Sequence, residues 1–195
     1  MARHASGFVN LRALLISALL IVACGDGAAE DPKSVSPYAA TPDSVVEAML
    51  KLASVGPRDY VIDLGSGDGR LVIAAAKEHG ASGLGVDIDP KLVDIAKRFA
   101  ARDGVQDRAQ FVVQDLFETD VRPATVVTIY LLPTIMDRVG HKLRAELRPG
   151  TRIVVHDYPL PGWPIDRVTS FDVPEKRDYT TNERATLYLY TVPSR

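Results

Sequence analysis

Two alternating patterns of hydrophobic and polar residues run along the chain from about residue 38 to its end. Short runs rich in Val, Ile and Leu are typical of strands buried on both faces, and longer stretches with apolar residues every three or four positions are typical of amphipathic helices. This alternation favours an α/β domain on a mostly parallel sheet. The predicted strands span residues 60–64, 83–86, 110–113, 125–130, 152–156, 167–173 and 184–192.

Helices are predicted between most of these strands. Asp89 followed by Pro90 is typical of a helix start, because aspartate caps the first amides and proline fits the first helical position. Thr41 and Pro42 have the same form and predict a cap on the first helix. The predicted helices span about residues 42–55, 71–79, 90–103 and 134–146, and no helical pattern separates the last two strands.

The N-terminal residues follow a different pattern. Arg3 and Arg12 precede an uncharged apolar run over residues 13–23, which is too short to cross a bilayer comfortably and fits a secretory signal. The run ends in Ala23-Cys24, which resembles a bacterial lipobox. A cysteine in that place is lipidated after cleavage.

This pattern predicts three segments: a signal peptide over residues 1–24, a flexible tether of about 20 Å reach over residues 25–36, and a folded domain over residues 37–195. Positive residues ahead of the apolar run predict a cell-envelope protein, lipid-anchored through Cys24 on the non-cytoplasmic face. The alternatives are an uncleaved anchor, or a misassigned start codon and a cytoplasmic protein.

Composition narrows the class of partner. The 195 residues are 46% hydrophobic, enough for one ordinary domain core, and a monomer is expected. The net charge of −2 provides no basic field for nucleic acid, so no nucleic-acid partner is expected. Cys24 is the single cysteine and the four histidines lack ligand spacing, so no metal site is predicted.

The most distinctive chemistry lies in residues 61–70. A predicted strand runs into a loop with glycines at alternate positions, and the loop opens directly into an alanine-rich helix. Glycines allow a sharp turn and leave no side chain between backbone and ligand, while the amides of the helix start point at that ligand. The pattern predicts a nucleotide-sized cradle, with ligand contacts from Gly65, Ser66, Gly67 and Gly69.

Acidic residues indicate which nucleotide the cradle binds. Asp63 and Asp68 would repel a pyrophosphate, and no lysine follows the loop as a phosphate-binding loop requires. The dinucleotide pattern also fails, because its third glycine would fall at Arg70. The acids suit a nucleoside that carries positive charge, which is the character of S-adenosylmethionine with its ammonium and sulfonium groups.

Two further positions follow from the strand order. Asp87 ends the second predicted strand, about 20 residues after the loop, where a carboxylate binds both ribose hydroxyls. Ligands in open α/β sheets bind at the carboxyl ends of the strands, so residues 130–133, after the fourth strand, are predicted to face the transferable methyl group.

The motif over residues 63–69 resembles the first motif of class I S-adenosylmethionine-dependent methyltransferases. The resemblance implies a Rossmann-like α/β fold: a mostly parallel seven-stranded sheet with helices on both faces and an antiparallel last strand. It also implies S-adenosylmethionine as cofactor, with its amino-acid end held by Asp63.

The same resemblance implies roles for four other residues. Asp115 would accept from the adenine amino group and Leu116 would pack on the adenine ring, although Asp115 could instead cap a short turn. Tyr38 and Thr41 would contact the cofactor from the segment that leads into the domain, although capping and packing explain these two residues equally well.

A narrower resemblance is carried by Tyr38 to Pro42, residues 63–70, residues 130–133 and the Trp163 segment, residues 159–164. Together they resemble the family with sequence similarity 173, whose eukaryotic members methylate lysines on mitochondrial inner-membrane proteins. The resemblance implies methyl transfer to an amine, above all a protein lysine, with a membrane or envelope protein as partner. A small-molecule methyltransferase and a lipid-anchored, non-catalytic module that binds S-adenosylmethionine or adenosine remain alternatives.

A lysine acceptor would attack the sulfonium methyl in line as a neutral amine, so the enzyme must align and desolvate it. Tyr130 is then the candidate that orients the amine through its hydroxyl, and Asp157 or His156 is the candidate that helps to remove the proton. Trp163 either walls the acceptor channel or belongs to the core.

Overall fold

The computed structural model describes residues 39–178 and 183–194. The predictions for residues 1–36, Cys24 and Tyr38 lie outside the described residues. In chain order the elements are α1 (Asp43–Leu52), β1 (Tyr60–Leu64), α2 (Arg70–His79), β2 (Ser82–Asp87), α3 (Pro90–Arg102), β3 (Ala109–Val113), β4 (Val126–Ile129), α4 (Pro133–Glu146), β5 (Arg152–His156), β6 (Arg167–Asp172), the 3-10 helix η1 (Pro174–Asp178) and β7 (Arg184–Thr191). The predicted alternation is confirmed, with most ends shifted by one to three residues.

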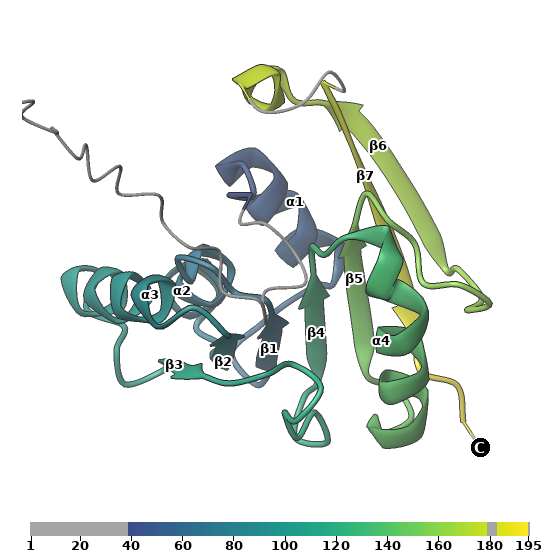
Figure 1. Ribbon diagram of the computed structural model, residues 1–195, viewed down its shortest axis with the longest axis horizontal. Coiled ribbons are helices and arrows are strands. Elements are labelled where there is room, and N and C mark those ends of the chain that lie inside the picture. Colours follow the sequence, from purple (N-terminus) through teal and green to yellow (C-terminus); the bar gives the residue numbers. More distant parts are fainter. Residues whose placement is uncertain (1–38, 179–182, 195) are drawn as a thin grey trace, which may run out of the picture. The chain divides into compact units, whose positions relative to one another are not determined.

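The strands form one seven-stranded sheet in the order β3-β2-β1-β4-β5-β7-β6 (Figure 1). The pairs from β3 across to β5 are parallel, and β7 is antiparallel to both of its neighbours, β5 and β6. The predicted α/β fold with an antiparallel last strand is therefore confirmed. The last strand also inserts itself between the fifth and the sixth.

Alternate residues of the central strands pack against different helices. In β1, Val61 faces the apolar cluster built by α1 and α2, whereas Ile62 and Leu64 face the cluster built by α4. A third cluster joins α2, α3 and β3, so these helices lie side by side on the face that α1 also covers (Figure 1). All four residues of β4 are buried, because helices or loops cover both of its faces.

The strand order indicates which end of the sheet can bind a ligand. From β1 the chain proceeds to β2 and β3 on one side and then crosses to β4 on the other side. At such a switch point the loops after two neighbouring parallel strands diverge and open a crevice outside their carboxyl ends. The loop after β1 and the residues after β4 are in contact at this end of the sheet, where Gly65 lies against Leu131.

Helix ends test the capping predictions. Asp89 caps α3 as predicted, because its Oδ1 accepts from the Lys91 amide at 2.8 Å and Pro90 follows it. The prediction for α1 is wrong by one residue. The helix begins at Asp43 with Pro42 as its N-cap residue, and no side chain caps it. Thr41 lies outside the helix, which leaves its backbone carbonyl available to another part of the fold.

Within residues 39–178 and 183–194, no helix has the length and apolar character of a membrane span.

Candidate functional site

The glycine loop after β1 is held to the end of β2 by its own amides. The amides of Gly65 and Ser66 both donate to the Val86 carbonyl, at 3.0 and 2.9 Å, and the Gly67 amide donates to Asp87 Oδ2 at 2.8 Å. Gly65 has a φ of +80°, and a Cβ there would stand 2.8 Å from Leu131 Cδ2. The loop therefore packs directly against the residues that follow β4, and only glycine fits at its first position.

An acid of the chain itself occupies the start of α2. Asp68 Oδ1 accepts from the Arg70 amide at 3.3 Å and from Arg70 Nε at 2.9 Å. This carboxylate supplies the negative charge that a helix N-terminus favours. A carboxylate in this place would repel a phosphate, and the predicted contact of the helix-start amides with the ligand stays a prediction.

Asp63 is a buried acid with a strongly raised pKa. The carboxyl group is buried at the end of β1 and accepts from Thr128 Oγ1 of β4 at 2.7 Å. Burial raises its pKa to about 7, and the nearby carboxylates of Asp87 and Asp68 act in the same direction, against the Thr128 hydrogen bond. A cation bound beside Asp63 would restore the charged form, so this acid suits an ammonium or sulfonium ligand.

Asp87 lies at the carboxyl end of β2 and holds the glycine loop. Oδ2 accepts from the Gly67 amide at 2.8 Å, and Oδ1 accepts from the Asp89 amide at 3.0 Å. Each carboxylate oxygen has two acceptor positions, so these contacts leave capacity for ligand hydroxyls. The structure thus brings Asp63, Asp87 and the predicted glycines together at the carboxyl ends of β1 and β2.

Ser66 differs from the glycines around it. Its side chain is buried under the loop, close enough to Gly85 that a Cβ there would stand 2.7 Å from Ser66 Oγ. Among the described residues this hydroxyl has no hydrogen-bond partner. The predicted contact of Ser66 with the ligand stays a prediction.

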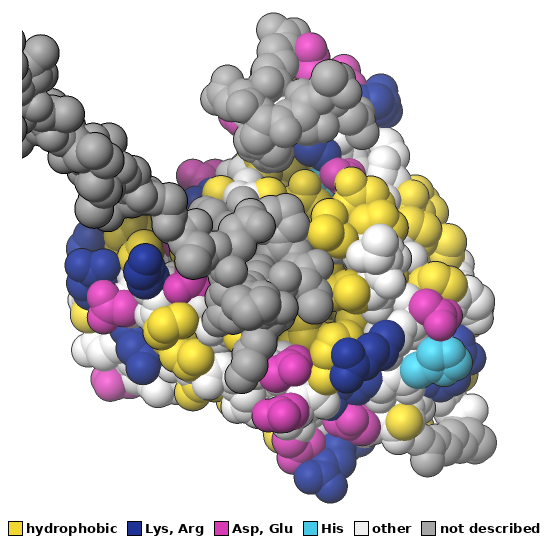
Figure 2. Space-filling model, viewed as in Figure 1, with side chains coloured by type: hydrophobic (Ala, Val, Ile, Leu, Met, Phe, Trp, Pro, Cys, Tyr) yellow, Lys and Arg dark blue, Asp and Glu magenta, His cyan; other side chains and the backbone are white. Residues whose placement is uncertain are grey.

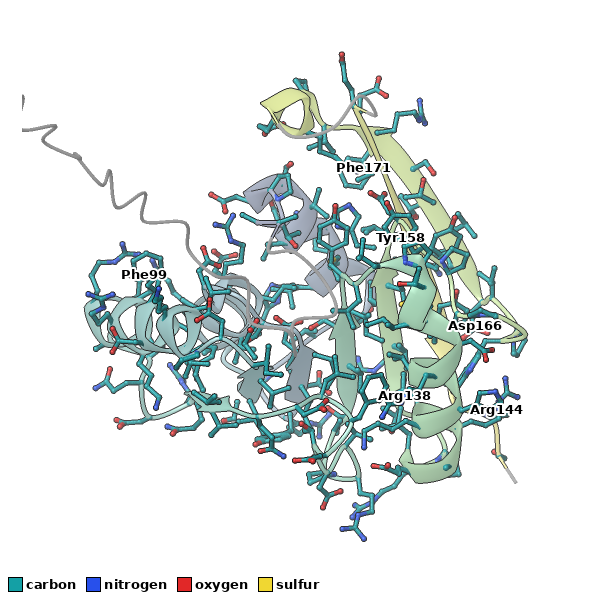
Figure 3. The ribbon with its side chains drawn as sticks, viewed as in Figure 1. Phe99, Arg138, Arg144, Tyr158, Asp166 and Phe171 are labelled. Atoms are coloured by element: carbon teal, nitrogen blue, oxygen red, sulfur yellow. The ribbon has the colours of Figure 1, made fainter. Side chains whose placement is uncertain are left out.

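The predicted adenine contacts follow β3. Asp115 Oδ1 accepts from the Phe117 amide at 2.8 Å, so Asp115 does cap a short turn, which was the alternative interpretation. Leu116 is buried in the cluster on the α4 side of the sheet. Arg138 of α4, labelled in Figure 3, places its guanidinium carbon 3.5 Å from the centroid of the Phe117 ring in this turn. The adenine roles of Asp115 and Leu116 stay predictions.

Tyr130 and His156 meet at the ends of the neighbouring strands β4 and β5. Their ring centroids lie 4.0 Å apart at 31°. His156 is fully buried, and neither ring nitrogen has a hydrogen-bond partner among the described residues. Burial, with a smaller contribution from Lys176 and against the charge of Asp157, lowers the pKa of His156 to about 4. The imidazole is therefore neutral at neutral pH.

Asp157 is bound to a lysine that no local sequence pattern singles out. Lys176 is 1% exposed, and its ammonium donates to Asp157 Oδ2 and to the Arg184 carbonyl. The Thr186 amide donates to Asp157 Oδ1 at 3.0 Å, and Asp157 itself has a φ of +63°. This pairing favours a structural role for Asp157 and weakens its assignment as the proton acceptor, which stays a prediction.

Trp163 has the contacts of a core residue. It is buried in the cluster on the α4 side, with an edge-to-face contact to Tyr190 at 6.2 Å between ring centroids and with Arg144 stacked on its ring. A Cβ on Gly140 would stand 3.1 Å from Trp163 Nε1, so the indole packs directly on the backbone of α4. The core interpretation of Trp163 therefore accounts for its contacts.

Charge on the visible surface is mixed: Figure 2 shows basic and acidic side chains of the described residues interspersed, with no single basic area. In the described parts of the chain, no group of three or more His, Cys, Asp or Glu side chains is arranged to hold a metal ion. The site thus offers buried acids, backbone and two rings, which fit a cationic nucleoside such as S-adenosylmethionine.

Comparison with known proteins identifies the family. Residues 63–167 match the model of the ANTKMT methyltransferase domain. A protein-lysine N-methyltransferase of Saccharolobus islandicus is 38% identical over 80% of this chain and 93% of its own length. The adenine nucleotide translocase lysine N-methyltransferase of Mus musculus is 34% identical over 70% of this chain, which spans only 63% of that enzyme.

A solved structure gives a close match as well. The structure described as an RNA methyltransferase from Salinibacter ruber, in complex with S-adenosyl-L-homocysteine, superposes with a TM-score of 0.72 at 43% identity and covers 80% of this chain and 95% of its own. With the acidic cradle described above, these matches show that the chain belongs to the ANTKMT methyltransferase domain family and is an S-adenosylmethionine-dependent methyltransferase.

Proposed function

We propose that this protein transfers the methyl group to the side-chain amine of a lysine in another protein. The observation that carries the proposal is the match to the archaeal protein-lysine N-methyltransferase, which extends over 93% of that enzyme. The adenine nucleotide translocase enzyme, of which this chain spans less than two thirds, supports the same acceptor chemistry but not the same substrate.

The residues of the site fit transfer to an amine. S-adenosylmethionine, when bound, supplies a sulfonium methyl that a neutral amine can attack. Asp63 and Asp87 would hold the cofactor at the ends of β1 and β2. Tyr130 would orient the amine from the end of β4, and the neutral ring of His156 packs against the Tyr130 ring. The buried, neutral imidazole of His156 offers no charge that would stabilise an ammonium, and desolvation favours the reactive neutral amine.

The name of the Salinibacter structure raises a second candidate, transfer to RNA. The net charge of −2 and the mixed surface charge argue against it, because RNA binding depends on a positive field along the phosphates. An RNA acceptor is therefore an outcome that the test must be able to reveal.

The proposal is tested with the full chain, methyl-labelled S-adenosylmethionine, and separated envelope and cytosolic fractions. We expect label on a discrete protein band that survives ribonuclease and disappears with protease, and mass spectrometry should place it on lysine. Label that ribonuclease removes would replace the proposal with RNA methylation. Label in small molecules only would favour a small-molecule acceptor, and cofactor binding with no transfer would favour the binding module.

Tyr130→Phe tests the acceptor side of the site. Removing the hydroxyl should lower kcat by about tenfold or more, since one hydrogen bond that aligns the amine contributes about 1 to 2 kcal/mol, while the affinity for S-adenosylmethionine should change little. Tyr60→Phe is the matched control, because Tyr60 starts β1 and so lies at the amino ends of the parallel strands, away from Tyr130 at the carboxyl end of β4. Equal rates for the two variants would remove Tyr130 from the mechanism.

We also propose that the protein is anchored in the cell envelope through a lipid on Cys24. The apolar run over residues 13–23 and the lipobox-like Ala23-Cys24 support this location. Cys24→Ser should abolish incorporation of labelled palmitate and move the protein out of the membrane fraction. A palmitate-free wild-type protein in the cytosol would instead support the alternative start codon, and would place the domain beside the cytoplasmic supply of S-adenosylmethionine.

A further inference from the structure

Arg70 joins two segments that the sequence keeps 29 residues apart. Its Nε and Nη2 form a fork on the Asp68 carboxylate, at 2.9 Å to Oδ1 and 2.5 Å to Oδ2. Its Nη1 donates to the Thr41 carbonyl at 2.7 Å and lies 3.6 Å from Asp43 Oδ1. One guanidinium thus binds the glycine loop and the chain that leads into α1.

The helix that follows the leading segment, residues 39–42, packs against α2. Val45 and Val46 of α1 pack in one apolar cluster with Leu71 of α2. Thr41 and Pro42 are buried, although no side chain caps the helix after them. The Arg70 contact therefore reaches the leading segment itself, at the point where it passes the loop that cradles the cofactor.

A second Asp-x-Arg pair in the same chain shows what the fork does by itself. Asp120 and Arg122 form the same arrangement: the arginine amide donates to Asp120 Oδ1 at 3.0 Å, Nε donates to Oδ1 at 2.7 Å, and Nη2 donates to Oδ2 at 2.8 Å. Their side chains are 50% and 66% exposed, against 11% and 30% for Asp68 and Arg70. The Asp68–Arg70 pair differs from the Asp120–Arg122 pair because it is less exposed and because Arg70 also donates to the Thr41 carbonyl.

We propose that Arg70 is a positioning residue that couples the leading segment, residues 39–42, to the glycine loop, so that ordering of this segment over the cofactor site depends on the Asp68–Arg70–Thr41 bridge. The guanidinium has the geometry for this role, because a rigid fork can satisfy a carboxylate and still present a donor to a carbonyl on its other side. The inference rests on the cofactor site and not on the identity of the acceptor.

Arg70→Lys in the full chain tests the bridge, with Arg122→Lys as the matched control. Lysine keeps the charge but cannot form the fork and the third contact together. We expect the Kd for S-adenosylmethionine and for S-adenosylhomocysteine to rise at least tenfold in Arg70→Lys and to stay within twofold of wild type in Arg122→Lys. Hydrogen exchange at the amides of Thr41 and Asp43 should be slowed by the cofactor in the wild type and far less in Arg70→Lys.

Two outcomes would contradict the proposed positioning role and would show that Arg70 contributes only its positive charge or only stability. Wild-type affinity in Arg70→Lys would mean that only the charge matters and would overturn the proposal. A lower melting temperature with unchanged cofactor affinity would assign Arg70 to stability and would also overturn it. Both measurements use the cofactor alone, so they remain decisive even where no protein acceptor is found.

Discussion

Asp63→Asn is expected to make the free protein more stable at pH 8 while it weakens binding of S-adenosylmethionine by roughly 10- to 100-fold. The carboxyl group is 3% exposed, and its pKa lies at about 7 because of burial first and the nearby acids second. A folded-state pKa above the unfolded value means that the native protein holds this proton more tightly than the unfolded chain. The contribution of Asp63 to the free energy of unfolding is fully present below about pH 4 and is lost as the pH rises through about 7.

The loss at pH 8 is on the order of 2 to 4 kcal/mol for a group as deeply buried as this one. Asparagine can still accept from Thr128 and does not titrate, so its unfolding free energy should fall much less between pH 5 and pH 8. Urea unfolding at pH 5, 6, 7 and 8 measures how the free energy of unfolding changes with pH in the wild type and in Asp63→Asn. Binding should suffer because a buried charge that meets a cation contributes about 1.5 to 3 kcal/mol.

The control for this variant is Asp120→Asn. Asp120 is exposed, and its hydrogen bonds with Arg122 lower its pKa to about 2, so its titration lies far below the window of interest. Its variant should follow the wild-type curve from pH 5 to pH 8. Parallel curves for Asp63→Asn and the wild type over this range would show that Asp63 is not the perturbed acid.

Asp87→Ala should lower the affinity for S-adenosylmethionine by about 100- to 1,000-fold and abolish detectable methyl transfer. The carboxylate is predicted to accept from both ribose hydroxyls, and two charge-assisted hydrogen bonds account for about 3 to 5 kcal/mol. The Asp87 carboxylate also accepts from the Gly67 amide, so its removal takes away a hydrogen bond that holds the glycine loop. Titration calorimetry with S-adenosylhomocysteine measures the affinity without any acceptor.

Asp89→Ala and Asp87→Asn separate these two contributions. Asp89 lies two residues away and caps α3, so its loss should cost about 1 kcal/mol of stability with little change in affinity. Asparagine at position 87 can still accept from the Gly67 amide but lacks the charge, and we expect an intermediate affinity. If Asp87→Ala bound the cofactor as well as Asp89→Ala, the ribose assignment would be wrong.

Local sequence determined most of the fold. The apolar periods of Val126–Ile129 and of α4, and the Asp89-Pro90 helix start, depend on neighbours within a few residues, and these elements form as predicted. The motif over residues 63–69 indicated a class I methyltransferase, since closely spaced glycines beside acids suit one kind of ligand, and the family model matches the longer stretch of residues 63–167. Patterns of this kind depend on short-range contacts, so they can be read without knowledge of the tertiary structure.

Tertiary structure alone decided which groups face each other. Asp63 meets Thr128 across 65 residues and thereby becomes a perturbed acid. Asp157 is bound by Lys176, a residue with no local pattern, and Thr41 contributes its carbonyl to Arg70 instead of capping α1. The contact of Asp63 follows from the pairing of β1 with β4, and the contact of Thr41 follows from the packing of α1 against α2. Strand order is set by the burial of whole faces, which no single stretch of sequence encodes.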